Sequence, residues 1–182
     1  MRVNLGSILR ATAGLRGDHV VIRFGDRAVT YDELDRAASG IAASLRARGL
    51  APGDNVALMV PNVPEFTMAY FGILYAGCTV VPINVLLSGE EVQYHLEDSE
   101  AKLLVAHSFF RATADQGAGA AGVPVVWTEG EAARAAAAGR RRRAGVAPPS
   151  PPAIGCRLIR LGTSGSETSA TRRSTWPGGG GR

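Results

Sequence analysis

The stretch that decides the fold is Val56–Leu87, which reads VALMVPNVPEFTMAYFGILYAGCTVVPINVLL. It shares most of its length with an uncharged run of 24 residues, Phe66–Gly89, which is long enough for a membrane span. Pro64 and Gly77 interrupt the stretch, and the residues after Gly77 change to β-branched types. These interruptions and the change of residue type predict a buried strand, a helix and a second buried strand. We therefore expect a βαβ unit of an α/β domain rather than a single transmembrane helix.

The residues before this stretch continue the alternation of strands and helices. Thr30 and Glu33 have the spacing of a capping box, and Gly49 is a natural stop, so a helix is predicted between Thr30 and Gly49. Its apolar residues recur at helical spacing and predict one buried stripe: Leu34, Ala37, Ala38, Ile41, Ala42 and Leu45. Val20–Phe24 and Ala28-Val29 are predicted as short strands, whereas residues 1–19 carry only weak signals.

The residues after Asn55 repeat the pattern. Predicted strands cover Asn55–Val60, Thr79–Pro82, Lys102–Ala106 and Val123–Trp127. Asn62 with Glu65, and Ser88 with Glu91, predict two further helix starts, the second helix running to about Asp98. In the first of these helices the predicted buried stripe is Phe66, Ala69, Tyr70, Ile73 and Leu74. Strands that alternate with helices predict a parallel sheet with flanking helices, with a poorly patterned linking segment before the last strand.

The charge of the chain divides it into two unlike parts. Residues 1–130 hold nine Arg, one Lys and 14 acidic residues, whereas residues 131–182 hold ten Arg and two acidic residues. The net charge of +4 is therefore an average of −4 and +8. No apolar stretch after Met1-Arg2 reads as a signal peptide, and Cys78 and Cys156 fit neither a disulfide framework nor a metal site. We expect a cytoplasmic protein on these grounds.

Residues 131–182 show no apolar periodicity and consist mainly of Arg, Ala, Gly, Pro, Ser and Thr. The sequence therefore predicts two parts: a partial α/β subdomain over 1–130 and a low-complexity tail over 131–182. One interpretation of the tail is a disordered basic segment that binds nucleic acid or an acidic partner. The other is a reading-frame error in GC-rich DNA, which yields the same set of amino acids.

Four clusters of residues together resemble the N-terminal region of the adenylate-forming (AMP-binding) superfamily, of the acyl-CoA synthetase or fatty-acid–CoA ligase type. Each cluster is weak alone, but all four occur in order and at family-like spacing across residues 20–106. The clusters are Thr30-Tyr31-Asp32-Glu33-Leu34; Gly49-Leu50 with Gly53-Asp54-Asn55-Val56-Ala57-Leu58 and Pro61-Asn62; Ala76-Gly77-Cys78-Thr79-Val80-Val81-Pro82-Ile83-Asn84; and Glu91-Val92-Gln93-Tyr94 with Leu96, Asp98, Ser99 and Lys102.

The resemblance implies a fold and a reaction. The fold is the N-terminal part of the large domain of an adenylate-forming enzyme. In the reaction, a carboxylic acid attacks the α-phosphate of ATP to give an acyl-adenylate and pyrophosphate, and coenzyme A then displaces AMP. Backbone amides, cations and Mg²⁺ are needed around the nucleotide because the first step joins two anions. Pro82-Ile83-Asn84 is more similar to acyl-CoA synthetases than to the adenylation domains of peptide synthetases.

The phosphate loop of the family has the form Thr-Ser-Gly-Thr-Thr-Gly-x-Pro-Lys-Gly, and here only Thr163, Ser164 and Gly165 match its start. Glu167 follows where acidic charge would repel phosphate, and no Gly-x-Pro-Lys-Gly comes after it. We expect no productive binding of ATP, Mg²⁺ or coenzyme A by this chain alone, and no catalysis. The second hypothesis is a non-enzymatic α/β module with a basic tail. His107 follows a strand where α/β ligands usually bind, although a structural role is the plainer interpretation.

Overall fold

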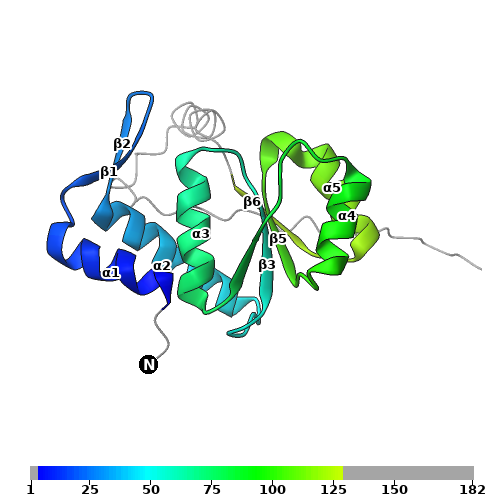
Figure 1. Ribbon diagram of the computed structural model, residues 1–182, viewed down its shortest axis with the longest axis horizontal. Helices are drawn as coiled ribbons and strands as arrows, with labels where there is room; N and C mark the ends of the chain where they lie inside the picture. Colours follow the sequence, from blue (N-terminus) through cyan, green and yellow to red (C-terminus); the bar gives the residue numbers. More distant parts are fainter. Residues whose placement is uncertain (1–3, 129–182) are drawn as a thin grey trace, which may run out of the picture.

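The computed structural model describes residues 4–128 (Figure 1). Their elements, in chain order, are α1 (Leu5–Arg16), β1 (Val20–Phe24), β2 (Arg27–Thr30), α2 (Tyr31–Ala47), β3 (Asn55–Met59), α3 (Pro64–Ala76), β4 (Thr79–Pro82), α4 (Gly89–Asp98), β5 (Leu103–His107), the 3₁₀ turn η1 (Ser108–Phe110), α5 (Arg111–Ala121) and β6 (Val125–Thr128). The predicted boundary between 1–130 and 131–182 lies outside the described residues, and so do the predicted Thr163, Ser164 and Gly165.

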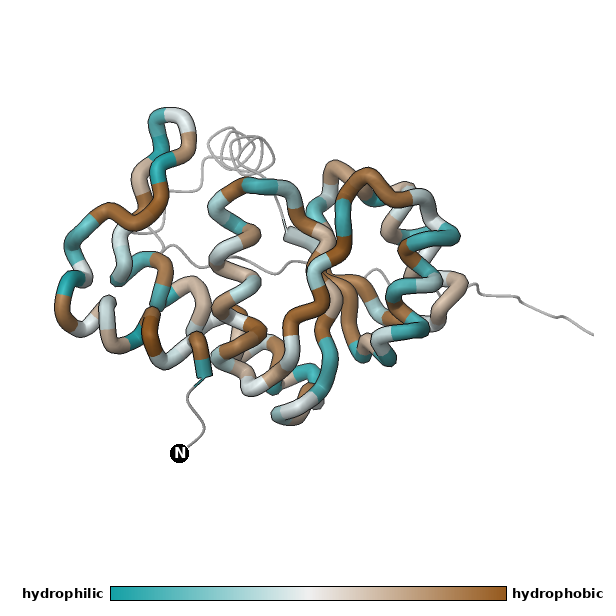
Figure 2. Tube along the Cα trace, in the orientation of Figure 1, coloured by the Kyte–Doolittle hydropathy of each residue, from teal (hydrophilic) through white to brown (hydrophobic). Residues whose placement is uncertain are grey.

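The centre of the molecule is a four-stranded parallel sheet in the order β4-β3-β5-β6. Strands β1 and β2 form a separate antiparallel hairpin, which rises beside α1 and α2 at the left of Figure 1. Strand β3 is buried along Val56–Met59. In Figure 2 the central strands are mostly brown, the colour of hydrophobic residues. The predicted parallel α/β fold is confirmed.

Helices cover both faces of the sheet. Side chains alternate across a strand, so Val56 and Leu58 face a core shared with α2 and α3, while Ala57 and Met59 face one shared with α4 and α5. Helix α1 packs outside α2 and α3 and adds Leu9 to the first core. Among residues 4–128, no helix combines the length and the apolar character that a membrane span requires.

Most predicted elements have the expected place. The buried residues of α2 are the six predicted from its periodicity, and the capping boxes of Thr30 with Glu33 and of Ser88 with Glu91 are both formed. The prediction of a second fully buried strand is wrong, because β4 is an edge strand whose Thr79 and Pro82 are exposed. In the α3 stripe Ala69 and Ile73 are buried, whereas Phe66, Tyr70 and Leu74 are only half-buried.

The predicted N-cap of α3 is also wrong. Val63, not Asn62, is the N-cap, and it makes no side-chain capping hydrogen bond. The ring of Pro64 disfavours the helical region for the residue before it, so Val63 is extended at φ −120° and ψ 163°. Asn62 therefore lies one residue outside the helix, and Glu65 is left to make a different contact.

Two helices were not predicted. Residues 5–16 form α1, although the first 19 residues carry weak signals, and the linking segment before the last strand contains η1 and α5. Helix α5 reads RATADQGAGAA, and its buried residues are Ala114, Gly117 and Ala118. Such small residues give no strong hydrophobic periodicity, which is why the helix was missed.

Candidate functional site

The carboxyl edge of the parallel sheet is the place where the fold brings chemically capable side chains together. Strand β3 comes first in the chain, β4 lies on one side of it and β5 on the other. The chain thus reverses its direction of travel between β3 and β5, and crevices at such switch points are where open α/β sheets usually bind ligands. Polar groups of two elements near this edge act on one another, since the Glu65 carboxylate of α3 acts electrostatically on His107 of β5, and Arg27 of β2 pairs with Glu65.

Arg27 and Glu65 form a buried ion pair. The Arg27 Nη1 atom donates to Glu65 Oε1 over 2.8 Å, and the two side chains are 17% and 3% exposed. Glu65 lies in the first turn of α3, where the helix dipole favours a carboxylate. Charges removed from water to this degree are tolerated when they are paired, so the contact fixes the hairpin to the start of α3.

His107 is half-buried at the end of β5. Burial lowers the pKa of its imidazole, and the nearby Glu65 carboxylate opposes that shift. Its Nδ1 accepts a hydrogen bond from the backbone N–H of Phe109 at 3.2 Å, which places the proton of the neutral ring on Nε2. A neutral imidazole can donate through Nε2 at neutral pH.

Thr128 is the register partner of His107 on β6, at the same edge. Thr128 is 3% exposed, and its Oγ1 atom has no hydrogen-bond partner within residues 4–128. On the opposite face of the sheet, the guanidinium of Arg111 lies 4.1 Å from the ring centroid of Trp127, and Phe109 is 82% exposed. Sequence reasoning found the edge through His107 but missed Arg27 and Thr128, which carry no motif.

Cys78 is not part of this edge. It lies between α3 and β4, and its thiol donates to the Ala51 carbonyl at 3.5 Å. Burial raises the pKa of the Cys78 thiol, with Asp54 adding to the shift, so the thiol stays protonated. Cys78 is a free cysteine that is buried in the first core. Within the described part of the chain, no group of three or more His, Cys, Asp or Glu side chains could hold a metal ion.

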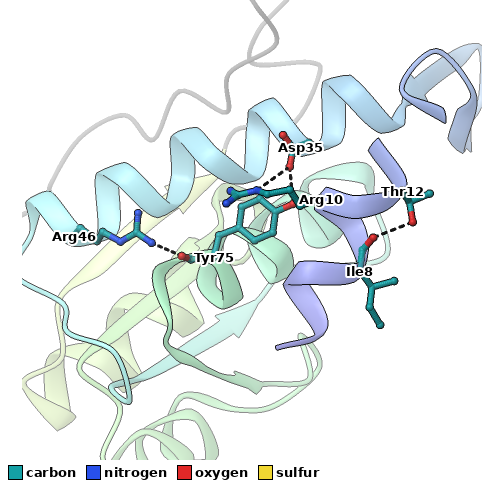
Figure 3. A network of polar contacts seen from close by, with 6 residues as sticks. All are labelled: Ile8, Arg10, Thr12, Asp35, Arg46 and Tyr75. Carbon is teal, nitrogen blue, oxygen red and sulfur yellow. Dashed lines mark hydrogen bonds and ion pairs between the residues drawn. The ribbon is translucent and has the colours of Figure 1, made fainter. Parts of the chain in front are cut away.

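A second polar network lies at the opposite end of α3 (Figure 3). The hydroxyl of Tyr75 donates to Asp35 Oδ1 at 2.6 Å, and the Arg10 guanidinium lies over the Tyr75 ring at 4.4 Å. Arg46 donates to the Tyr75 carbonyl. Burial, with the Asp35 carboxylate, raises the pKa of Tyr75, which keeps the phenol protonated as a donor. These contacts join α1, α2 and α3 into one layer.

A hollow of about 430 Å³ lies beside this network, lined by residues of α1 and the last turn of α3. Its lining residues are Asn4, Gly6, Ser7, Arg10, Ala11, Leu74 and Tyr75. The end of α3 leads into the start of β4, so the hollow lies toward the amino edge of the sheet and not at the switch point. Its one guanidinium already contacts Tyr75 and Asp35, so we assign it no chemistry.

Comparisons with known proteins agree on one family. The family described as "AMP-binding enzyme" matches residues 9–156. A long-chain-fatty-acid–CoA ligase of Bacillus subtilis is 36% identical over 101 residues, which are 56% of this chain and 18% of that ligase. Tyrocidine synthase 3 of Brevibacillus parabrevis is 38% identical over 91 residues, 50% of this chain and 1% of that protein.

The solved structures include a benzoate CoA ligase from Burkholderia xenovorans, which superposes with a TM-score of 0.66 at 25% identity. The superposition covers 70% of this chain and 26% of that one. The chain therefore spans only a small part of the length of the proteins it resembles.

Proposed function

Because the chain belongs to the AMP-binding enzyme family, we propose that its described residues are the first α/β subdomain of an acid–CoA ligase. The parent reaction activates a carboxylic acid, in our proposal a fatty acid, with ATP and transfers the acyl group to coenzyme A. The observation that carries this proposal is the family match over residues 9–156. The parallel sheet is the scaffold of the described part of that region.

Acyl transfer to coenzyme A is preferred over peptide synthesis because of the segment after β4. Pro82-Ile83-Asn84 is the sequence feature that favours acyl-CoA synthetases. In the structure the Ile83 N–H donates to the Leu58 carbonyl at 2.9 Å, and Asn84 Oδ1 accepts from the Leu86 N–H at 3.0 Å. Asn84 thus closes a local turn after β4.

The proposal assigns no step of the ATP chemistry to residues 4–128. ATP, Mg²⁺ and coenzyme A would be held by the longer enzyme. When bound, Mg²⁺ would stabilise the charge that develops on the phosphate oxygens. Our proposal keeps the division into a subdomain over 1–130 and a tail over 131–182, and it keeps Thr163, Ser164 and Gly165 as the start of a degenerate phosphate loop.

A chimera tests the proposed function directly. The matched 101-residue segment of the Bacillus subtilis ligase is replaced by the corresponding segment of this chain, and ATP–pyrophosphate exchange is measured with a long-chain fatty acid. We expect exchange within about tenfold of the intact ligase, since the segment supplies scaffold rather than catalytic groups. A folded chimera without exchange would overturn the proposal.

The 182-residue chain itself is the second arm of the test. We expect no ATP–pyrophosphate exchange above the background without protein, with either a fatty acid or benzoate as the acid. The intact Bacillus subtilis ligase serves as the positive control. Exchange by the purified chain that disappears in the Ser164→Ala variant would show that its phosphate loop works, and would contradict the proposed inactivity.

A further inference from the structure

The two edge strands of the main sheet, β4 and β6, present different main-chain edges. In β4 and just after it, the N–H groups of Thr79 and Ile83 donate on the side of β3. Main-chain groups of alternate residues point to opposite sides of a strand, so those of Val80 and Pro82 face outward. Because proline has no N–H, the outer edge of β4 keeps one donor, and such an edge is poorly suited to pairing with another strand.

The outer edge of β6 keeps its donors. The Leu104 N–H of β5 donates to the Pro124 carbonyl at 2.9 Å, so by the same alternation Val126 directs its main-chain groups toward β5. Val125 and Trp127 direct theirs outward, where no further strand lies among residues 4–128. The strand reads VVWT and contains no charged residue, proline or bulge that would protect this edge.

The side chains of β6 are buried although it is an edge strand. Its four residues are between 2% and 8% exposed, whereas Thr79 and Pro82 of β4 are exposed. The Thr128 Oγ1 atom at its end has no hydrogen-bond partner within residues 4–128. Buried polar groups are nearly always paired in folded proteins, so the unpaired hydroxyl and the open main-chain edge both indicate a further element beside β6.

The chain beyond the described residues begins at this edge. Fifty-four residues, 129–182, follow directly after Thr128, and the family match continues among them to residue 156. All four Leu and Ile residues of this part lie between Ile154 and Leu161. The 25 residues between Thr128 and Ile154 exceed the dozen or so that a crossover connection needs, so residues 154–161 can reach the outer edge of β6.

We propose that the outer edge of β6 is a docking surface for residues 154–161 of the same chain, which add a fifth strand to the sheet. The N–H groups of Val125 and Trp127 donate to this strand. Charged side chains protect an edge strand from further pairing, and Arg157 and Arg160 suit the new edge for that reason. The proposal does not depend on ligase activity, so its test and that of the proposed function fail independently.

Hydrogen exchange measured by NMR on the 182-residue chain is the first test. Adjacent residues face opposite sides of a strand, so the double variant Leu158→Pro with Ile159→Pro removes a ladder donor whichever side pairs with β6. In that variant we expect the Val125 and Trp127 amides to exchange at least about tenfold faster, while the Val126 amide is unchanged.

The control variant, Thr168→Pro with Ser169→Pro, makes the same change beyond the segment and should leave all three rates as they are in the unaltered chain. Retained protection of the β3 and β5 amides shows that each variant is folded. Unchanged Val125 and Trp127 rates in the segment variant would overturn the proposal. So would a loss of their protection on dilution together with a dimer in sedimentation, because the edge would then pair with a second copy.

Cys156 offers a test that needs no variant. It shares a strand face with Ile154 and Leu158, the face expected to lie on the core, while Cys78 is already buried. With 5,5′-dithiobis(2-nitrobenzoic acid) as the probe, we expect both thiols to react at least about tenfold more slowly in the native chain than in urea. One thiol that reacts at the unfolded rate would be Cys156, and would overturn the proposal.

Discussion

The two faces of the sheet are built in the same way from different residues. Each face is covered by a pair of helices, α2 with α3 and α4 with α5. The first core is filled by large side chains such as Leu34, Ile41 and Ile73, whereas alanines line much of the second. Large residues on helices give strong periodicity, and small residues allow close approach. The first face was therefore predictable from sequence and the second was only partly so.

The largest expected effects come from shortening a large side chain on the first face of the sheet and enlarging a small one on the second. Ile73→Ala removes a fully buried side chain from α3 and should lower the free energy of unfolding by about 2–5 kcal/mol. Ala118→Leu enlarges a residue of α5 that is 1% exposed and should cost about 1–3 kcal/mol through overpacking. Urea denaturation followed by circular dichroism measures both losses.

Leu86→Ala is the control, because Leu86 is 84% exposed and its loss should change the free energy of unfolding by less than about 0.5 kcal/mol. If Ala118→Leu were as stable as the unaltered chain, the second face would hold spare volume. The contrast between a large-residue core and a close-packed small-residue core would then be wrong.

The next effect concerns the glycines at which the helix pairs cross. A Cβ on Gly72 of α3 would lie 2.5 Å from Ile41 Cγ2, and one on Gly117 of α5 would lie 2.7 Å from Val92 Cβ and from the Gly89 carbonyl oxygen. Both alanine variants should lose about 1–3 kcal/mol of stability, with Gly117→Ala the worse because backbone cannot move aside as a side chain can.

Gly40 of α2 and Gly119 of α5 are matched controls, since a Cβ there would meet nothing within 4 Å. Alanine at either position should raise the free energy of unfolding by about 0.5–1 kcal/mol, because alanine loses less backbone entropy in a helix than glycine does. The sign of the change should thus differ between Gly117 and Gly119 in the same helix. The same sign at both positions would remove the close-crossing argument.

The same contrast explains how far the sequence could predict the fold and the site. Capping boxes and wide apolar stripes gave α2 and α4, and the apolar runs gave β3 and β5, because local physics and the final fold agree there. Helix α5 was not predicted because its Ala and Gly residues give little hydrophobic periodicity. At the carboxyl edge, His107 was placed from the strand pattern, but its interaction with Glu65 joins residues 42 positions apart in sequence. No local pattern records such a contact.

A smaller effect separates the two capping boxes. Thr30 caps α2 at a partly buried place, whereas Ser88 caps α4 in solvent. Thr30→Ala should cost about 1–2 kcal/mol and Ser88→Ala about 0.5–1 kcal/mol, since water replaces a lost cap more easily at an exposed helix end. Thermal unfolding of the two variants at one pH gives the order. A larger loss for Ser88→Ala would contradict the difference in burial.

The smallest effect is a pH dependence that arises from His107. The pKa of His107 is lowered by burial, so between its folded value and the unfolded value of about 6.5 the unfolded chain binds more protons. The stability contributed by the neutral ring is present above pH 6.5 and is lost as the pH falls toward the folded pKa. Denaturation of His107→Gln by urea between pH 7.5 and 5 should therefore show a shallower loss of stability than the unaltered chain, and an equal loss in the two would contradict the prediction.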